Sequence, residues 1–355
     1  MVGGSWGPFP VENPQRLERP FKVTVSYTHT CNLDCRLCYA DCGRHPERRE
    51  LSGEEWKRHL SEWSDGGIVA LLVEGGEPLY RGDCLDVLAH AAPLMLTRLR
   101  THGSLVTPDV ARRLAGIGVA TVLVDLWGAT PATHDDLVGA SGAFAQTISG
   151  IEALRHAGVP TQLLFIMNRR NIDELQAWVE LAHALGVGTV GVLRPYPIGR
   201  ARRGWNDLSL PLSSMMEALA GLRLPEGMTL MQSWHPNDGN CCWQMAAVNA
   251  WGDSIGCTYL REFVNYGNVA TTTLFETWNH PLCRELRAGH VEKSCTGCSH
   301  SQGSHGGCRS TAYAFHGRWS AADPFDAPLN EGVDLSELPD WMLQPIPRPP
   351  HSSRG

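Results

Sequence analysis

The sequence predicts an α/β protein: an open, partial (β/α)6 barrel followed by a small cysteine-rich α+β region. Two observations support this fold class. From residue 22 to about residue 193, short β-branched runs alternate with amphipathic stretches, the pattern of parallel strands joined by crossover helices. Between residues 234 and 326 the composition is instead rich in Gly, Cys and His. Because the alternation stops near Pro195, six units are favoured over the eight of a closed barrel.

Each predicted strand is a short run of apolar and β-branched residues. The six strands span residues 21–28, 67–76, 94–103, 119–128, 160–168 and 187–195. Helices are predicted between them from amphipathic stretches, several of which begin with Ser, Thr or Asn and end on Gly, the residues that favour helix caps. The clearest helices span residues 52–63, 107–118, 143–158 and 171–186.

The pattern divides the chain into five parts. Residues 1–20 are an N-terminal extension, and residues 21–205 are the partial barrel. Residues 206–233 are a linker to the cysteine-rich region, residues 234–326. The last part, residues 327–355, is a Pro-rich tail that we expect to be extended after a short segment near residues 335–343.

Charge and composition exclude several classes of protein. The formal net charge is −7, and no run of Lys and Arg indicates nucleic-acid binding. No segment is apolar for long enough to span a membrane, and the N-terminus lacks the pattern of a signal peptide, so we expect a cytoplasmic protein that binds neither nucleic acid nor membrane. In a reducing compartment, the chain's 12 cysteines are better explained as metal ligands than as disulfides.

Three cysteines lie close together just after the first predicted strand, at Cys31, Cys35 and Cys38. A cluster of four irons and four sulfides normally has four thiolate ligands, so three thiolates leave one iron open to bind a substrate. The loop lies at the carboxyl end of the parallel sheet, where open α/β folds bind their ligands. A zinc site completed by Cys42 is the alternative, and the spacing suits the larger cluster better.

A second motif, Gly75-Gly76-Glu77-Pro78, follows the second predicted strand. The two glycines allow backbone to approach a ligand closely, and the Glu77 carboxylate can bind an ammonium group. A simple tight turn is the alternative. Two further candidates are Tyr27, which could line the pocket or merely pack, and Arg194, which could bind a substrate carboxylate or phosphate or lie in a solvated loop.

The two motifs together resemble those of radical S-adenosylmethionine (SAM) enzymes, and the resemblance extends from about residue 21 to residue 326. It implies a [4Fe-4S] cluster with one open iron, SAM bound to that iron, and a 5′-deoxyadenosyl radical. It also implies that Gly75, Gly76 and Glu77 hold the methionyl amine and that Leu37 faces the adenine. The residues that would contact ribose or carboxylate are Asp125 and Asn168.

The C-terminal cysteines resemble those of the SPASM extension, or its shorter twitch form, which binds auxiliary iron-sulfur clusters. Cys242, Gly252 and Cys257 fit its first part, and Cys295, Cys298 and Cys308 fit its second, with Ser304 in place of one cysteine. The resemblance implies one auxiliary cluster held by Cys242, Cys257, Cys308 and Cys241. Cys295 and Cys298 either complete that cluster or hold a second one with ligands such as Asp326, Ser304, His300 or His305. A structural zinc site is the alternative.

The substrate is predicted from the N-terminal segment. Many peptide-modifying relatives carry an N-terminal module that grips a leader peptide, whereas 30 residues precede Cys31 here. We therefore expect a small-molecule substrate, such as a sugar, an aminocyclitol or a nucleoside sugar acid, that is decarboxylated or dehydrogenated in antibiotic biosynthesis.

Two alternatives remain: maturation of a ribosomally made peptide with a separate leader-recognition partner, and a non-catalytic zinc-binding interaction protein. For the enzyme, a reductase such as flavodoxin or ferredoxin is the expected electron-donating partner.

Overall fold

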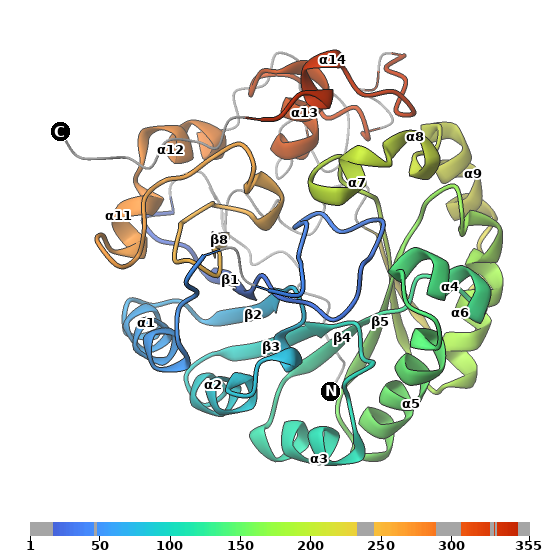
Figure 1. The fold of residues 1–355 in the computed structure, drawn as a ribbon, viewed down its shortest axis with the longest axis horizontal. Coiled ribbons are helices and arrows are strands. Elements are labelled where there is room, and N and C mark those ends of the chain that lie inside the picture. The colour runs from blue at the N-terminus through green and yellow to red at the C-terminus, as the bar shows by residue number, and fades with distance from the viewer. Residues whose placement is uncertain are drawn as a thin grey trace.

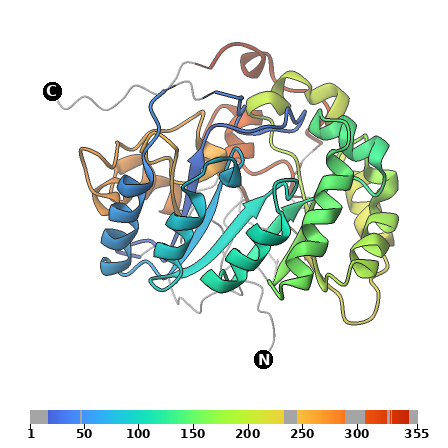
Figure 2. The same cartoon turned by 60° about the horizontal axis from the view of Figure 1, so that its bottom comes forward.

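The computed structural model describes residues 17–45, 48–232, 245–288, 307–326, 330 and 332–346. Its centre is a parallel sheet of eight strands in the order β7-β6-β5-β4-β3-β2-β1-β8. Helices run around the outer side of this curved sheet, residues 245–288 lie next to β1, and the helices of residues 309–316 and 340–343 lie near the helix of residues 199–203 (Figures 1 and 2). The predicted α/β fold with a partial barrel is therefore confirmed.

All six predicted strands are present, and the sheet has two more. The six are β1 (Lys22–Thr28), β2 (Ala70–Gly75), β3 (Leu96–Thr101), β4 (Thr121–Asp125), β5 (Thr161–Ile166) and β6 (Thr189–Leu193). The sequence did not predict β7 (Thr229–Gln232) and β8 (Met245–Val248), the two edge strands. Each has four residues, too few for a period of two to stand out. Because β8 pairs with β1, the C-terminal region begins as part of the barrel's sheet.

The crossover helices start and end on the capping residues that the sequence indicates. The Ser52 side chain and Glu55 form a capping box at α1, and Gly118 ends α3 in the left-handed conformation. The helices of the barrel are α1 (Gly53–Asp65), α2 (Cys84–Ala91), α3 (Pro108–Ile117), α4 (Pro131–Val138), α5 (Ala143–His156), α6 (Leu175–Ala184), α7 (Gly199–Arg203), α8 (Trp205–Leu208) and α9 (Leu212–Gly221). Those that follow are α11 (Leu274–Trp278), α12 (Pro281–Ala288), α13 (Arg309–His316) and α14 (Asp340–Leu343).

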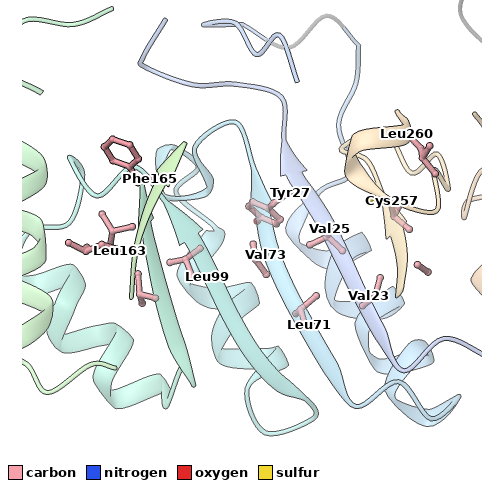
Figure 3. Close-up of a cluster of buried hydrophobic side chains, with 14 of the residues drawn as sticks. Val23, Val25, Tyr27, Leu71, Val73, Leu99, Leu163, Phe165, Cys257 and Leu260 are labelled. Atoms are coloured by element: carbon pink, nitrogen blue, oxygen red, sulfur yellow. The ribbon is translucent and has the colours of Figure 1, made fainter. Parts of the chain in front are cut away.

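The hydrophobic core lies between the sheet and its helices. Alternate residues of β1, namely Val23, Val25 and Tyr27, are buried in it (Figure 3). Cys257 and Leu260 of the C-terminal region belong to the same buried cluster (Figure 3). The described part of that region is therefore packed on the barrel. Among the described residues, no helix combines the length and the apolar character needed to cross a membrane.

One buried ion pair also joins the C-terminal region to the barrel. Arg194, just after β6, donates from Nη1 to Asp323 Oδ2 over 2.7 Å, and both side chains are almost fully buried. Further along, Trp205 Nε1 donates to the carbonyl of Leu335 over 2.7 Å. These contacts fix the C-terminal segments against the carboxyl side of the barrel strands.

Candidate active site

The three-cysteine loop follows β1 and is held in place by backbone hydrogen bonds. Cys31 N donates to Gly43 O over 2.8 Å, which closes the loop, and Asp34 N donates to Val138 O over 3.1 Å. Cys31, Cys35 and Cys38 all line one cavity at the carboxyl ends of the barrel strands. The structure therefore brings together the three thiols that the sequence predicted as cluster ligands.

The thiols of the loop differ in their pKa values. Burial raises the pKa of Cys31 to about 12 and also raises that of Cys35. The side-chain hydrogen bond from Cys42 lowers the pKa of Cys38 to about 6, against the effect of burial. Arg200 favours the thiolate form of all three ligand cysteines. A positive charge beside clustered thiols suits ligands that must lose their protons to bind iron.

The donor set fits an iron-sulfur cluster better than a single metal ion. Thiolates are the usual ligands of such clusters, and the cysteines that line the cavity here are Cys31, Cys35, Cys38 and Cys42. In the part of the chain that the structure describes, no three His, Cys, Asp or Glu side chains converge closely enough to hold one metal ion. The geometry thus favours the cluster over the zinc alternative for this loop.

Gly75 and Gly76 bring the end of β2 against this loop. Gly75 has a φ of +139°, and a Cβ there would lie 2.5 Å from Thr28 O. A Cβ on Gly76 would lie 2.0 Å from Thr30 O. Both glycines line the cavity, so their lack of a side chain is required where the strand end meets the loop.

Glu77 is fully buried and accepts hydrogen bonds from the end of β3. Its carboxylate accepts hydrogen bonds from Thr101 Oγ1 at 2.8 Å and from His102 N at 3.0 Å, and Leu79 N also donates to it at 2.9 Å. Thr101 and His102 line the cavity, whereas Glu77 does not. The structure therefore gives Glu77 a positioning role, and its contact with the amine of SAM stays a prediction.

A chain of polar side chains crosses the cavity. Arg100 forms two hydrogen bonds of 2.8 Å with the Asp125 carboxylate, which also accepts from Trp127 Nε1 at 3.1 Å. Arg100 Nη1 lies 3.8 Å from Glu74 Oε2, and the Tyr39 hydroxyl donates to Glu74 Oε1 over 2.5 Å. All five side chains line the cavity.

The sequence predicted one member of this chain, Asp125, and missed Arg100. A signal was available: Arg98 and Arg100 are two charged residues at a spacing of two on a predicted strand. That spacing places both on one face, opposite the apolar Leu99, and so toward the inside of the barrel.

Of the other predicted residues, Leu37 lines the cavity and three do not. Asn168 is buried in the turn after β5, where its Oδ1 accepts from Arg170 N at 2.9 Å. Tyr27 lies on the core face of β1, and its hydroxyl donates to Asp83 Oδ1 over 2.7 Å. Arg194 is engaged by Asp323, as described above. Asn168, Tyr27 and Arg194 do not line this cavity, and their contacts with cofactor or substrate stay predictions.

Two predicted auxiliary ligands can be placed, since Cys257 and Cys308 are buried in the C-terminal region. Asp323 Oδ2 accepts a hydrogen bond from Cys308 N at 2.9 Å, so the ion pair with Arg194 also positions this cysteine. Asp326, a predicted alternative ligand, is buried as well. The other candidates lie outside the described residues: Cys241, Cys242, Cys295, Cys298, His300, Ser304 and His305.

Family models identify the class of protein to which this site belongs. Residues 25–182 match the radical SAM superfamily, and residues 241–299 match the iron-sulfur cluster-binding domain called SPASM. The chain therefore carries a radical SAM domain followed by a SPASM domain. Its cofactors are a [4Fe-4S] cluster, SAM and auxiliary iron-sulfur clusters, as the resemblance to the two families implied.

The relatives are enzymes that share most of their length with this chain. The chain is 28% identical to the PqqA peptide cyclase of Ruegeria pomeroyi, over 86% of each protein. It is 28% identical to the mycofactocin maturase MftC of Mycolicibacterium smegmatis, over 95% of this chain and 89% of MftC. It is 27% identical to the AdoMet-dependent heme synthase of Methanosarcina barkeri, over 86% of this chain and 96% of that enzyme.

Solved structures confirm the fold. Streptococcus suis SuiB bound to S-adenosylmethionine superimposes with a TM-score of 0.68 at 15% identity, over 82% of this chain and 74% of SuiB. The enzyme anSMEcpe with bound AdoMet has a TM-score of 0.64 at 15% identity, over 88% and 95% of the two chains.

These relatives correct the predicted substrate and reaction. Two of the relatives that share most of this chain's length are a peptide cyclase and a mycofactocin maturase, and a third is a heme synthase; none is named as a sugar-modifying enzyme. The expectation of a sugar-like substrate in antibiotic biosynthesis is therefore wrong. It rested on the short segment before Cys31, and the length of that segment does not determine what the barrel binds.

Proposed function

We propose that this protein is a radical SAM enzyme that modifies a ribosomally made peptide. The observation that carries the proposal is the similarity to a peptide cyclase and a maturase over 86% and 95% of this chain. In addition, the three ligand thiols and a chain of charged side chains line a single cavity. Together these favour one catalytic chamber that holds the cofactor and receives a segment of substrate.

The residues of the cavity have separate tasks in this proposal. Cys31, Cys35 and Cys38 would hold the [4Fe-4S] cluster, which with SAM supplies a 5′-deoxyadenosyl radical. Leu37 presents an apolar surface for the adenine. Gly75 and Gly76, which let the β2 end pack against the loop, would also let its backbone approach the bound cofactor.

The linked polar side chains that cross the cavity would orient polar groups of the substrate near the radical. Arg100 is held by Asp125 in a bidentate contact, so its planar guanidinium is fixed in direction. Trp127 and Val138 contribute apolar surface to the same cavity and would limit access of water to the radical.

Two finer features belong to the same proposal. A separate protein would recognise the leader peptide, and a reductase such as flavodoxin or ferredoxin would supply the electron. We place the reaction in the cytoplasm, because the thiols of Cys31, Cys35 and Cys38 must stay reduced to bind iron.

The test uses the full-length protein with its clusters reconstituted without oxygen. It is incubated with SAM, dithionite and candidate precursor peptides encoded beside its gene, and separately with a heme precursor, because one relative is a heme synthase. We expect a mass change in one peptide and 5′-deoxyadenosine that depends on that peptide. The control variant replaces Cys31, Cys35 and Cys38 by Ala and should form neither product.

Deuterium labelling identifies the substrate directly. If the peptide is the substrate, deuterium from one of its carbon positions should appear in 5′-deoxyadenosine. Turnover of the heme precursor alone, with every peptide unchanged, would contradict the proposal.

A further inference from the structure

Helix α7, which follows β6, contacts the three-cysteine loop, which follows β1 on the other side of the sheet. Arg200 N donates to Cys38 O over 2.8 Å. The Arg200 guanidinium donates from Nη1 to Cys35 O over 3.0 Å and from Nη2 to Cys42 O over 2.7 Å. One residue therefore binds three backbone carbonyls of the loop that carries the ligand cysteines.

The approach of α7 requires a glycine just before this arginine. Gly199 has a φ of +60°, and a Cβ there would lie 2.4 Å from Tyr39 O and 2.5 Å from Cys38 O. Gly199 N donates to Glu262 Oε1 over 2.9 Å, so the C-terminal region holds α7 in this position. The loop packs against Gly199 on one side and Glu262 holds this glycine from the other, so Arg200 is kept in contact with the loop.

The charges around Arg200 also act on the cluster loop. The Arg200 side chain is 20% exposed and pairs with Asp34 at 2.8 Å, and its Nε lies 3.4 Å from Asp41 Oδ1. Reduction adds an electron to a cluster, so a nearby cation stabilises the reduced state and nearby anions oppose it. Without Arg200, Asp34 would lose this cation and Asp41 would keep its pair with Arg203.

We propose that Arg200 is a positioning residue that raises the reduction potential of the radical SAM cluster by binding the carbonyls of its loop and compensating Asp34 and Asp41. This inference rests on the radical SAM domain and does not depend on the identity of the substrate. It concerns the step in which the cluster accepts its electron. The readout is the potential itself, which can be measured without turnover.

The experiment is a redox titration of reconstituted full-length protein, followed by electron paramagnetic resonance without SAM. Cys257→Ala with Cys308→Ala serves as the common background, so that auxiliary signals are reduced. In that background we compare Arg200→Gln, Arg200→Lys and the control Arg203→Gln. Arg203 is 59% exposed and pairs with Asp41, but the structure shows no contact of its side chain with the loop carbonyls.

We expect Arg200→Gln to lower the potential, Arg200→Lys to stay closer to the parent, and Arg203→Gln to lower it less than Arg200→Gln, because Arg203 compensates Asp41 but does not bind the loop carbonyls. Asp34→Asn removes an exposed negative charge beside Arg200 and should shift the potential upward. This second variant keeps the proposal testable if Arg200→Gln fails to retain iron. Potentials equal to the parent's in both Arg200→Gln and Asp34→Asn, or shifts of the same sign, would overturn the proposal.

Discussion

The buried pair between Arg194 and Asp323 allows a quantitative test of how the two parts of the chain are joined. The Asp323 carboxylate accepts from Arg194 Nη1 at 2.7 Å, from Thr311 Oγ1 at 2.6 Å and from Cys308 N at 2.9 Å. Replacing Arg194 by Met keeps most of the volume but leaves a buried carboxylate without its cation. Removing one partner of a buried pair costs about 3–5 kcal/mol.

The matched control is an exposed pair on α3. Arg112 and Asp109 lie 3.2 Å apart with side chains that are 68% and 70% exposed. Arg112→Met should therefore change the free energy of unfolding by about 0–0.5 kcal/mol. The two variants differ in burial and make the same change of residue type.

The assay is anaerobic urea unfolding of the full-length protein, followed by far-UV circular dichroism. A double-mutant cycle that adds Asp323→Asn isolates the coupling between the two side chains. We expect Arg194→Met alone to be several kcal/mol less stable than the parent and the double variant to recover part of that loss. A loss for Arg194→Met as small as that for Arg112→Met would refute the view that this pair fastens the C-terminal region to the barrel.

Three further predictions concern the site. Gly76→Ala places a methyl group against the three-cysteine loop and should lower the iron retained after reconstitution, whereas Gly82→Ala, which has nothing within 4 Å of its Cβ, should retain the parent amount. Glu77→Gln should destabilise the protein by about 1–3 kcal/mol, measured by urea unfolding, because one of several buried hydrogen bonds loses its acceptor. In metal-free protein, the hydrogen bond from Cys42 lowers the pKa of Cys38 to about 6. Cys42→Ala should therefore raise the pH at which iodoacetamide begins to label Cys38. An unchanged labelling profile would show that Cys42 does not set this pKa.

The strands and the first cluster loop could be predicted because their signals are local. Short apolar and β-branched runs identify β1 to β6, and the spacing of Cys31, Cys35 and Cys38 is a property of adjacent residues. The period of two along a strand also places Tyr27 with Val23 and Val25 on the core face of β1, so its exclusion from the cavity could have been predicted.

The remaining features depend on partners far away in the sequence. Arg194 is engaged by a carboxylate 129 positions later, which no local pattern reveals. Arg200 lies 165 positions after Cys35, whose carbonyl it binds. The edge strands β7 and β8 are defined mainly by pairing with β6 and β1, and their four residues carry too little pattern by themselves.

The central claim is that three thiols hold a cluster whose fourth iron is open to SAM. The most direct measurement is the electron paramagnetic resonance spectrum of the reduced cluster, with and without SAM, in reconstituted protein that carries Cys257→Ala and Cys308→Ala. We predict a [4Fe-4S] signal that changes when SAM is added and that disappears when Cys31, Cys35 and Cys38 are replaced by Ala. A signal that SAM leaves unchanged would show that SAM does not bind the cluster, and would contradict the account.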